Sequence, residues 1–79
     1  MNVLLFGITK EIIGSDTLYI SVKDNVKDVK SLKSFLNDKY PELKKLSSIA
    51  VAVNNKYAKE EDRITIDDEI ALIPPVSGG

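Results

Sequence analysis

The sequence predicts an α+β fold in which a mixed sheet of four to five strands carries one main helix on one face. Short apolar segments bounded by turn-forming residues predict strands, at residues 2–9, 17–22, 49–53 and 69–73. Only one stretch, between residues 25 and 40, has apolar residues at helical spacing. At 79 residues the chain has room for one domain, which we expect to cover residues 1–79.

The first two strands are expected to be joined by a turn. NVLLFGIT and TLYISV are both short and apolar, and Gly14, Ser15 and Asp16 supply turn chemistry between them.

The helix is expected to begin at Asn25, a capping residue, with Asp28 three positions later as in a capping box. Its apolar stripe follows at spacings of three and four, at Val29, Leu32, Leu36 and Tyr40. Pro41 ends the helix, because the residue before a proline is pushed out of the helical region.

The second half of the chain predicts a hairpin and a final strand. IAVAV is followed by Asn54-Asn55, a good two-residue turn because Asn tolerates positive φ, and KYA returns from it. A polar excursion over residues 59–68, interrupted by Ile64 and Ile66, leads into EIALI. Proline cannot donate a ladder hydrogen bond, so pairing should stop at Pro74 and the last residues should project.

The two most apolar segments, VLLFGI and EIALI, do not alternate apolar with polar residues. Two explanations are open. Adjacent, parallel, central strands tend to be continuously apolar. Alternatively, their outer face docks on another protein, since a large exposed apolar patch usually marks an interface. We favour docking, because one helix covers only one face of the sheet.

Composition excludes several kinds of site. The sequence has no Cys and no His, which removes disulfides, thiolate nucleophiles, imidazole bases and the usual zinc ligands, so no metal site is expected. The net charge is −1, whereas proteins that bind nucleic acid usually carry an excess of positive charge, so we expect no nucleic-acid partner. The run VLLFGI is too short for a signal peptide or a membrane span, so we expect a cytoplasmic protein without membrane contact.

Catalysis by this chain alone is not expected. The acids at 60–62 and 67–69 lie in polar stretches, where neighbouring acids are usually solvated loop residues. None of the seven serines lies in a nucleophile motif, and there is no glycine-rich phosphate loop. We therefore expect no self-contained active site and no bound cofactor.

The terminal carboxylate is the remaining candidate for chemistry. Glycine has no Cβ, so a Gly78-Gly79 tail can thread a channel too narrow for any other dipeptide. Once the Gly79 carboxylate is adenylated by ATP in a partner's site, its acyl group can be transferred to a sulfur or amine nucleophile. A chain without cysteine can then carry reactive sulfur as a thiocarboxylate with no thiol of its own to interfere.

The segments VLLFGITKEIIG, VAVNNKYA and DDEIALIPPVSGG together resemble the small, sulfur-carrying subunits of molybdopterin synthase, a ubiquitin-like, β-grasp family. The similarity covers essentially the whole chain, and its most specific part is PPVSGG directly after the last strand. The resemblance implies a β-grasp domain with a projecting Gly-Gly tail over residues 76–79.

The resemblance also implies a mechanism for molybdenum cofactor biosynthesis. An ATP-dependent, ubiquitin-activating-type enzyme adenylates Gly79, and a sulfur donor converts the adenylate to a thiocarboxylate. The tail, with Val76, Ser77 and Gly78, then threads into the large synthase subunit, where precursor Z receives the sulfur. In this family two small and two large subunits form a heterotetramer, so the chain would be a non-catalytic sulfur donor within a sulfurtransferase complex.

Docking residues follow from the same resemblance. Phe6 matches an apolar position on the first strand that faces the partner, and Ile73 matches a position that is often aromatic. Leu4 shares the face of Phe6 by strand alternation, and Pro74 and Pro75 complete the partner-binding set. An ordinary core role is the alternative for each.

One turn departs from the family pattern. The family usually has D-G-D-E-V before the last strand, whereas IDDEI places Asp67 where glycine is expected. Aspartate tolerates left-handed geometry better than most residues, so we expect the turn to survive with some strain. Ile73 in place of an aromatic residue would change the detailed partner contact and leave the tail chemistry intact.

Three other functions stay open. The chain could be a sulfur carrier for thiamine or tRNA thiolation, although PPVSGG argues against thiazole carriers, which usually lack the two prolines. It could be a ubiquitin-like protein modifier that joins Gly79 to target lysines, because the same adenylation precedes both fates. It could also be an interaction module with an inert tail.

Overall fold

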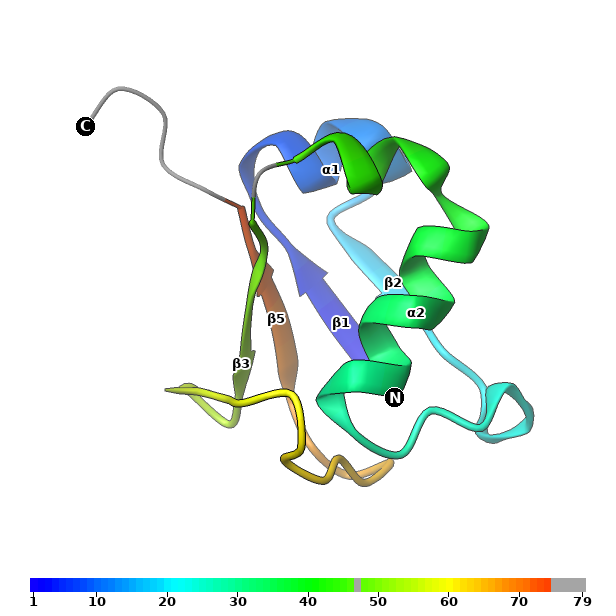
Figure 1. Cartoon of the computed structure of the whole chain (residues 1–79), viewed down its shortest axis with the longest axis vertical. Coiled ribbons are helices and arrows are strands. Elements are labelled where there is room, and N and C mark those ends of the chain that lie inside the picture. The colour runs from blue at the N-terminus through cyan, green and yellow to red at the C-terminus, as the bar shows by residue number, and fades with distance from the viewer. Residues whose placement is uncertain (47, 75–79) are drawn as a thin grey trace.

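The computed structural model describes residues 1–46 and 48–74. They form a mixed five-stranded sheet in the order β2-β1-β5-β3-β4, with the main helix lying across one face (Figure 1). The strands are β1 (Asn2–Leu5), β2 (Thr17–Tyr19), β3 (Ala50–Val53), β4 (Lys56–Tyr57) and β5 (Ile70–Ile73). The helices are α1 (Gly7–Ile13) and α2 (Val29–Lys39), with short 3₁₀ helices η1 (Val22–Asp24) and η2 (Pro41–Lys45). The predicted α+β fold with one main helix is confirmed.

The two most apolar segments form the parallel pair at the middle of the sheet. β1 and β5 run parallel, with Val3 opposite Ile70 and Leu5 opposite Leu72. β5 also pairs antiparallel with β3, and β1 with β2. Adjacent parallel strands are therefore part of the reason for the continuous apolar sequence, as one of the two explanations predicted.

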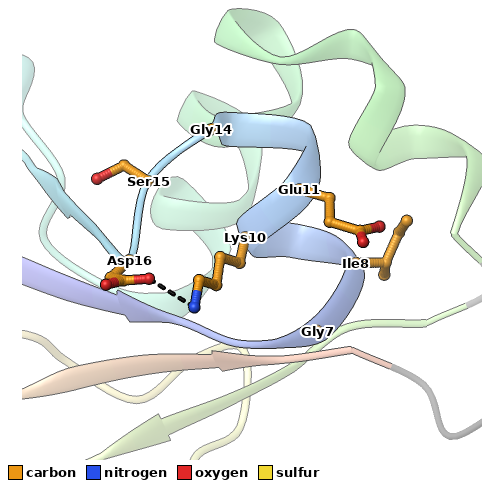
Figure 2. Close-up of a pocket in the computed structure, with 7 residues that line it drawn as sticks. All are labelled: Gly7, Ile8, Lys10, Glu11, Gly14, Ser15 and Asp16. Carbon is orange, nitrogen blue, oxygen red and sulfur yellow. Dashed lines mark ion pairs between the residues drawn. The ribbon is translucent and has the colours of Figure 1, made fainter.

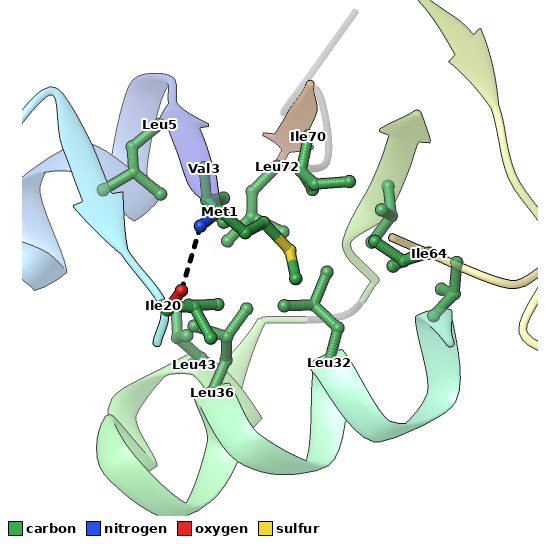
Figure 3. Packing of buried hydrophobic residues seen from close by; sticks show 12 residues of the cluster. Met1, Val3, Leu5, Ile20, Leu32, Leu36, Leu43, Ile64, Ile70 and Leu72 are labelled. Carbon is green, nitrogen blue, oxygen red and sulfur yellow. Dashed lines mark hydrogen bonds between the residues drawn. The ribbon is translucent and has the colours of Figure 1, made fainter. Parts of the chain in front are cut away.

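The hydrophobic core fills the space between α2 and the inner face of the sheet. The inner-face side chains are at most 3% exposed, namely Val3, Leu5, Val51, Ile70 and Leu72. Figure 3 shows Leu32 and Leu36 of α2 pointing toward these strands. Each fully buried leucine or isoleucine stabilises the fold by roughly 1.5–3 kcal/mol relative to leaving it exposed.

Helix α2 begins three residues later than predicted. Asp28 is its N-cap, because the Asp28 carboxylate accepts from the Ser31 N–H at 2.7 Å and the Ser31 hydroxyl accepts from the Asp28 N–H at 3.1 Å. Asn25 instead ends η1 with φ of 57°. The predicted end of the helix at Pro41 is confirmed, since α2 stops at Lys39.

The polar excursion over residues 59–68 holds the start of α2. The Asp62 and Glu60 carbonyl oxygens accept from the Val29 and Lys30 N–H groups at 3.0 and 2.9 Å. Those donors lack partners within the helix, as at every helix N-terminus. Ile64 is only 5% exposed and anchors the excursion in the core.

A second helix, α1, stands where the sequence predicted the rest of a strand and a turn. The prediction of a strand over residues 2–9 is wrong beyond Leu5. Gly7 has φ of +55°, which breaks the extended chain, and Gly14 ends the helix with φ of +85°. The helix has only seven residues, and its N-cap, Phe6, has no polar side chain to signal a helix start.

The hairpin prediction is confirmed. Asn54 and Asn55 have φ of 52° and 70°, as a two-residue turn with both central residues left-handed requires. The expectation of strain at Asp67 is wrong, because the non-glycine residues with positive φ in the described part of the chain are Asn25, Asn54 and Asn55. The turn is made instead by Asp68, whose carboxylate accepts from the Thr65 N–H at 2.8 Å.

Candidate docking site

Apolar side chains gather on the face of the sheet opposite α2. They surround a hollow of about 300 Å³, which we call the outer hollow. Its lining residues are Leu4, Phe6, Ala52, Asn55, Tyr57, Glu69, Ala71 and Ile73. The structure therefore brings together three of the predicted docking residues, from β1, from the residue after β1 and from the end of β5.

Strand register explains the shape of the outer hollow. Leu4 lies opposite Ala71, Ala71 opposite Ala52, and Ala52 opposite Tyr57, so these residues form one row across four strands. Residues in one such row project from the same face of the sheet. The two small alanines lie in the middle of the row, and the larger Leu4 and Tyr57 stand on either side of them.

Phe6 is held beside this row by a local hydrogen-bond pair. The Thr9 hydroxyl donates to the Phe6 carbonyl at 2.6 Å and accepts from the Phe6 N–H at 3.1 Å. Thr9 itself is completely buried. This pair keeps Phe6 extended, with φ of −133°, at the point where β1 ends and α1 begins.

Exposure separates the outer-hollow residues from the core. Phe6 is 49% exposed and Tyr57 is 74% exposed, which excludes an ordinary core role for Phe6. Leu4 and Ile73 are half-buried, and their neighbours Val3 and Leu72 are completely buried on the inner face. Exposed aromatic and branched apolar groups around a hollow are typical of protein–protein contact sites.

The chain leaves the sheet directly beside the outer hollow. Pro74 follows Ile73 at the end of β5, and its ring lies against Gly7 of the β1–α1 connection. The other predicted partner-binding and tail residues lie outside the described residues, namely Pro75, Val76, Ser77, Gly78 and Gly79.

A second, more polar hollow lies beside α1 (Figure 2). The Lys10 ammonium points toward Asp16 and forms an ion pair at 2.7 Å with its carboxylate. The hydrogen bond and the charge of Asp16 raise the pKa of Lys10. Both side chains are more than half exposed, so water and salt screen this ion pair and it adds little to stability.

Neither hollow contains a catalytic arrangement. Over residues 1–46 and 48–74, no three acidic side chains are grouped so that they could hold a metal ion. Every buried polar side chain in this part of the chain has a hydrogen-bond partner. Within the same residues, no helix is long and apolar enough to cross a membrane.

Tyr57, Ala52 and Ala71 are site residues that sequence reasoning missed. The hairpin turn was recognised, and counting the register back from it would have placed Tyr57 across from Ala52. Alternation along EIALI would have placed Ala71 on the face of Ile73. The sequence therefore indicates these positions, but only if β3 is first assumed to pair with β4 and with β5.

Comparison with known proteins agrees with the fold. A ThiS family model matches residues 3–79. The chain is 38% identical over 81 residues to the molybdopterin synthase sulfur carrier subunit of Dictyostelium discoideum, with 99% of this chain and 94% of that protein covered.

Solved structures show the same likeness. SAMP1 from Haloferax volcanii, a small archaeal modifier protein, is 30% identical with a TM-score of 0.78, covering 99% of this chain and 97% of that one. A chain in the complex of subunits 1 and 2 of the molybdopterin-converting factor from Helicobacter pylori is 28% identical with a TM-score of 0.65, covering 99% and 96%. The expected β-grasp fold is thus confirmed, and the chain belongs to the ThiS family.

Proposed function

We propose that this chain is the sulfur carrier subunit of a molybdopterin synthase in molybdenum cofactor biosynthesis. The observation that carries this proposal is the apolar outer hollow immediately beside the point where the chain leaves β5 at Pro74. A carrier needs a surface that docks and a tail that reaches into its partner's site. The relative from Dictyostelium discoideum, matched along almost its whole length, is named as such a subunit.

The chemistry takes place at Gly79. Its carboxylate oxygen attacks the α-phosphorus of ATP in an adenylating enzyme of the ubiquitin-activating type, and pyrophosphate leaves. Hydrosulfide supplied by a sulfur donor then attacks the carbonyl carbon. The bond from this carbon to the AMP oxygen breaks, AMP leaves, and a thiocarboxylate and a proton remain. The chain supplies the acyl group and the partners supply the catalytic groups. ATP is a substrate of the activating enzyme, and the reaction is placed in the cytoplasm, where ATP is available.

The partner that receives the sulfur is the large subunit of the synthase, which transfers it to precursor Z. Support comes from the Helicobacter pylori complex, in which the two subunits of the converting factor are bound together. We place Phe6, Leu4 and Ile73 in this contact, with Pro74 and Pro75 at its edge and residues 76–79 threaded into the large subunit. Two small and two large subunits form the complete assembly.

Protein modification is the second candidate, and one observation favours it. SAMP1 of Haloferax volcanii has the same fold and is a small archaeal modifier protein. A modifier would pass the same Gly79 adenylate to a lysine amine, so the two functions differ only in the nucleophile that follows.

The test is the intact mass of the chain isolated from its own host, with fragmentation of the C-terminal peptide. A sulfur carrier shows the mass increase for one oxygen replaced by sulfur, localised to Gly79. The matched control lacks only Gly79 and should show no such increase. An unmodified Gly79 during molybdenum-replete growth, together with Gly79 joined to lysines of other proteins, would replace the sulfur-carrier proposal with the modifier.

A further inference from the structure

The connection between β1 and α1 contacts the beginning of the C-terminal segment. Gly7 adopts φ of +55°, and a Cβ added there would lie 3.1 Å from the Pro74 Cγ atom. Real Cβ atoms rarely approach a neighbour so closely, so any other L-residue at this position would have to push the proline ring. Of the two described glycines, both left-handed, Gly7 is the one in close contact with the chain's exit from β5.

Hydrogen bonds hold the residues that lead into Gly7. The buried Thr9 hydroxyl bonds both the N–H and the carbonyl of Phe6, the residue before Gly7. The Leu5 N–H donates to the Asp16 carbonyl at 2.9 Å, which ties the end of β1 to the residue before β2. Figure 2 shows Gly7 at the bend where β1 passes into α1. Any displacement would therefore fall on Pro74, which is bonded to the tail.

Building on the function proposed above, we infer that Gly7 is a positioning residue that sets the direction in which the C-terminal segment leaves the outer hollow. Ile73 belongs to the outer hollow, and Pro74 is the next residue. The adenylating enzyme and the large subunit both receive the tail, and we place both on the outer hollow. A partner that binds the outer hollow and receives the tail needs a fixed distance and direction between the two. Gly7 keeps Pro74 at a fixed place beside the outer hollow. Because Gly7 has no side chain, the Pro74 ring can lie directly against the Gly7 backbone.

Gly7→Ala should therefore impair the reaction of the tail more than the docking of the face. A shift of a few tenths of an ångström at Pro74 moves the point at which the chain leaves β5 relative to the docked surface. Misplacement of about 1 Å at a reacting centre can cost about a hundredfold in rate, so we expect a loss of about tenfold in kcat. KM should stay unchanged, because the outer hollow itself is unaltered.

Gly14→Ala is the matched control. Gly14 also has a positive φ, of +85°, but nothing lies within 4 Å of a Cβ added there. Both substitutions thus strain a left-handed residue at an end of α1. They should lower the urea midpoint of unfolding by similar amounts, so a purely structural effect would appear equally in both.

The experiment measures ATP–pyrophosphate exchange by the purified adenylating enzyme across a range of carrier concentrations. Gly7→Ala should lower kcat, and Gly14→Ala should match the wild type in both kcat and KM. Pro74→Ala removes the Cγ atom that a Cβ at Gly7 would meet. Adding Gly7→Ala to Pro74→Ala should therefore cause no further loss of kcat, which makes the pair a double-mutant cycle.

Two results would overturn the inference: equal kcat for Gly7→Ala and Gly14→Ala, or a Gly7→Ala loss that is as large in the Pro74→Ala background. Failure of the proposed function is read separately, from the intact mass of the Gly79 peptide. A modifier would still support exchange with the wild-type chain, because both functions begin with the same adenylate, and a chain with an inert tail would support none.

Discussion

The two faces of the central β1–β5 pair are built from the same short segments and have different neighbours. On the inner face, Val3, Ile70 and Leu72 are completely buried under α2. On the outer face, Leu4 and Ile73 stand half-buried around a hollow with the exposed Phe6. Both explanations of the continuous apolar sequence therefore contain part of the answer. The strands are central and parallel, and one of their faces is still uncovered in the described chain.

This difference separates stability from recognition within single strands. Neighbouring residues of β5 alternate between the two faces, so Leu72 serves the core and Ile73 serves the outer hollow. The inner face is covered by the chain's own helix (Figure 3). A substitution on one face should therefore change mainly unfolding, and a substitution one position away should change mainly partner binding.

The largest effect is expected from the inner face. Leu72→Ala removes a completely buried side chain between β5 and α2 and leaves a cavity. Leucine-to-alanine changes in cores cost about 2–5 kcal/mol, which is a large part of the stability of a domain this small. Urea unfolding followed by circular dichroism measures the loss. A loss below about 1 kcal/mol would mean that the inner face repacks freely, and the contrast between the faces would then fail.

The outer face should show the reverse behaviour. Ile73→Thr keeps a β-branched residue in the strand, so stability should fall by less than about 1 kcal/mol. It removes apolar surface from the outer hollow, so affinity for the large synthase subunit should fall about tenfold or more, measured by calorimetry. Val22→Thr is the matched control, because Val22 is β-branched, is 69% exposed and lies in η1, outside the outer hollow. Equal losses of affinity in both variants would remove Ile73 from the contact.

Much of this arrangement could be predicted from the sequence, because its signals were local. Pro41 and the Asn54-Asn55 pair act through their own backbone preferences, and the structure follows both. The start of α2 was misplaced because Asn25 and Asp28 are both good capping residues. The choice between them depends on the Val29 and Lys30 N–H groups bonding to Asp62 and Glu60, thirty or more positions away.

Helix α1 was missed for a different reason, and the outer hollow was outlined only in part. The N-cap of α1 is a phenylalanine, and the polar group that stabilises this end is Thr9, three residues into the helix. Tyr57 joins the hollow only through pairing of β4 with β3. The Phe6–Thr9 contact is local but lacks the polar N-cap residue that signals a helix start. The place of Tyr57 follows from the predicted turn once β3 and β4 are assumed to pair.

The smallest effect is expected where the hairpin tip meets the turn before β5, away from both apolar faces. The Asp68 carboxylate accepts from the Thr65 N–H and from the Asn54 side-chain amide, and these bonds lower its pKa. A folded pKa below the unfolded one means that the stabilisation is present above the unfolded value of about 4. It is lost as the pH falls through the folded value.

Asp68→Asn places an NH₂ group against one of those two donors and removes the charge. Its urea midpoint should lie slightly below that of the wild type at neutral pH, and the gap should close as the pH falls below about 4. Asp67→Asn, the adjacent residue, controls for the loss of one negative charge. A gap that stays constant to low pH would show that the Asp68 hydrogen bonds do not depend on its ionisation, and that this junction contributes nothing to the acid sensitivity of the fold.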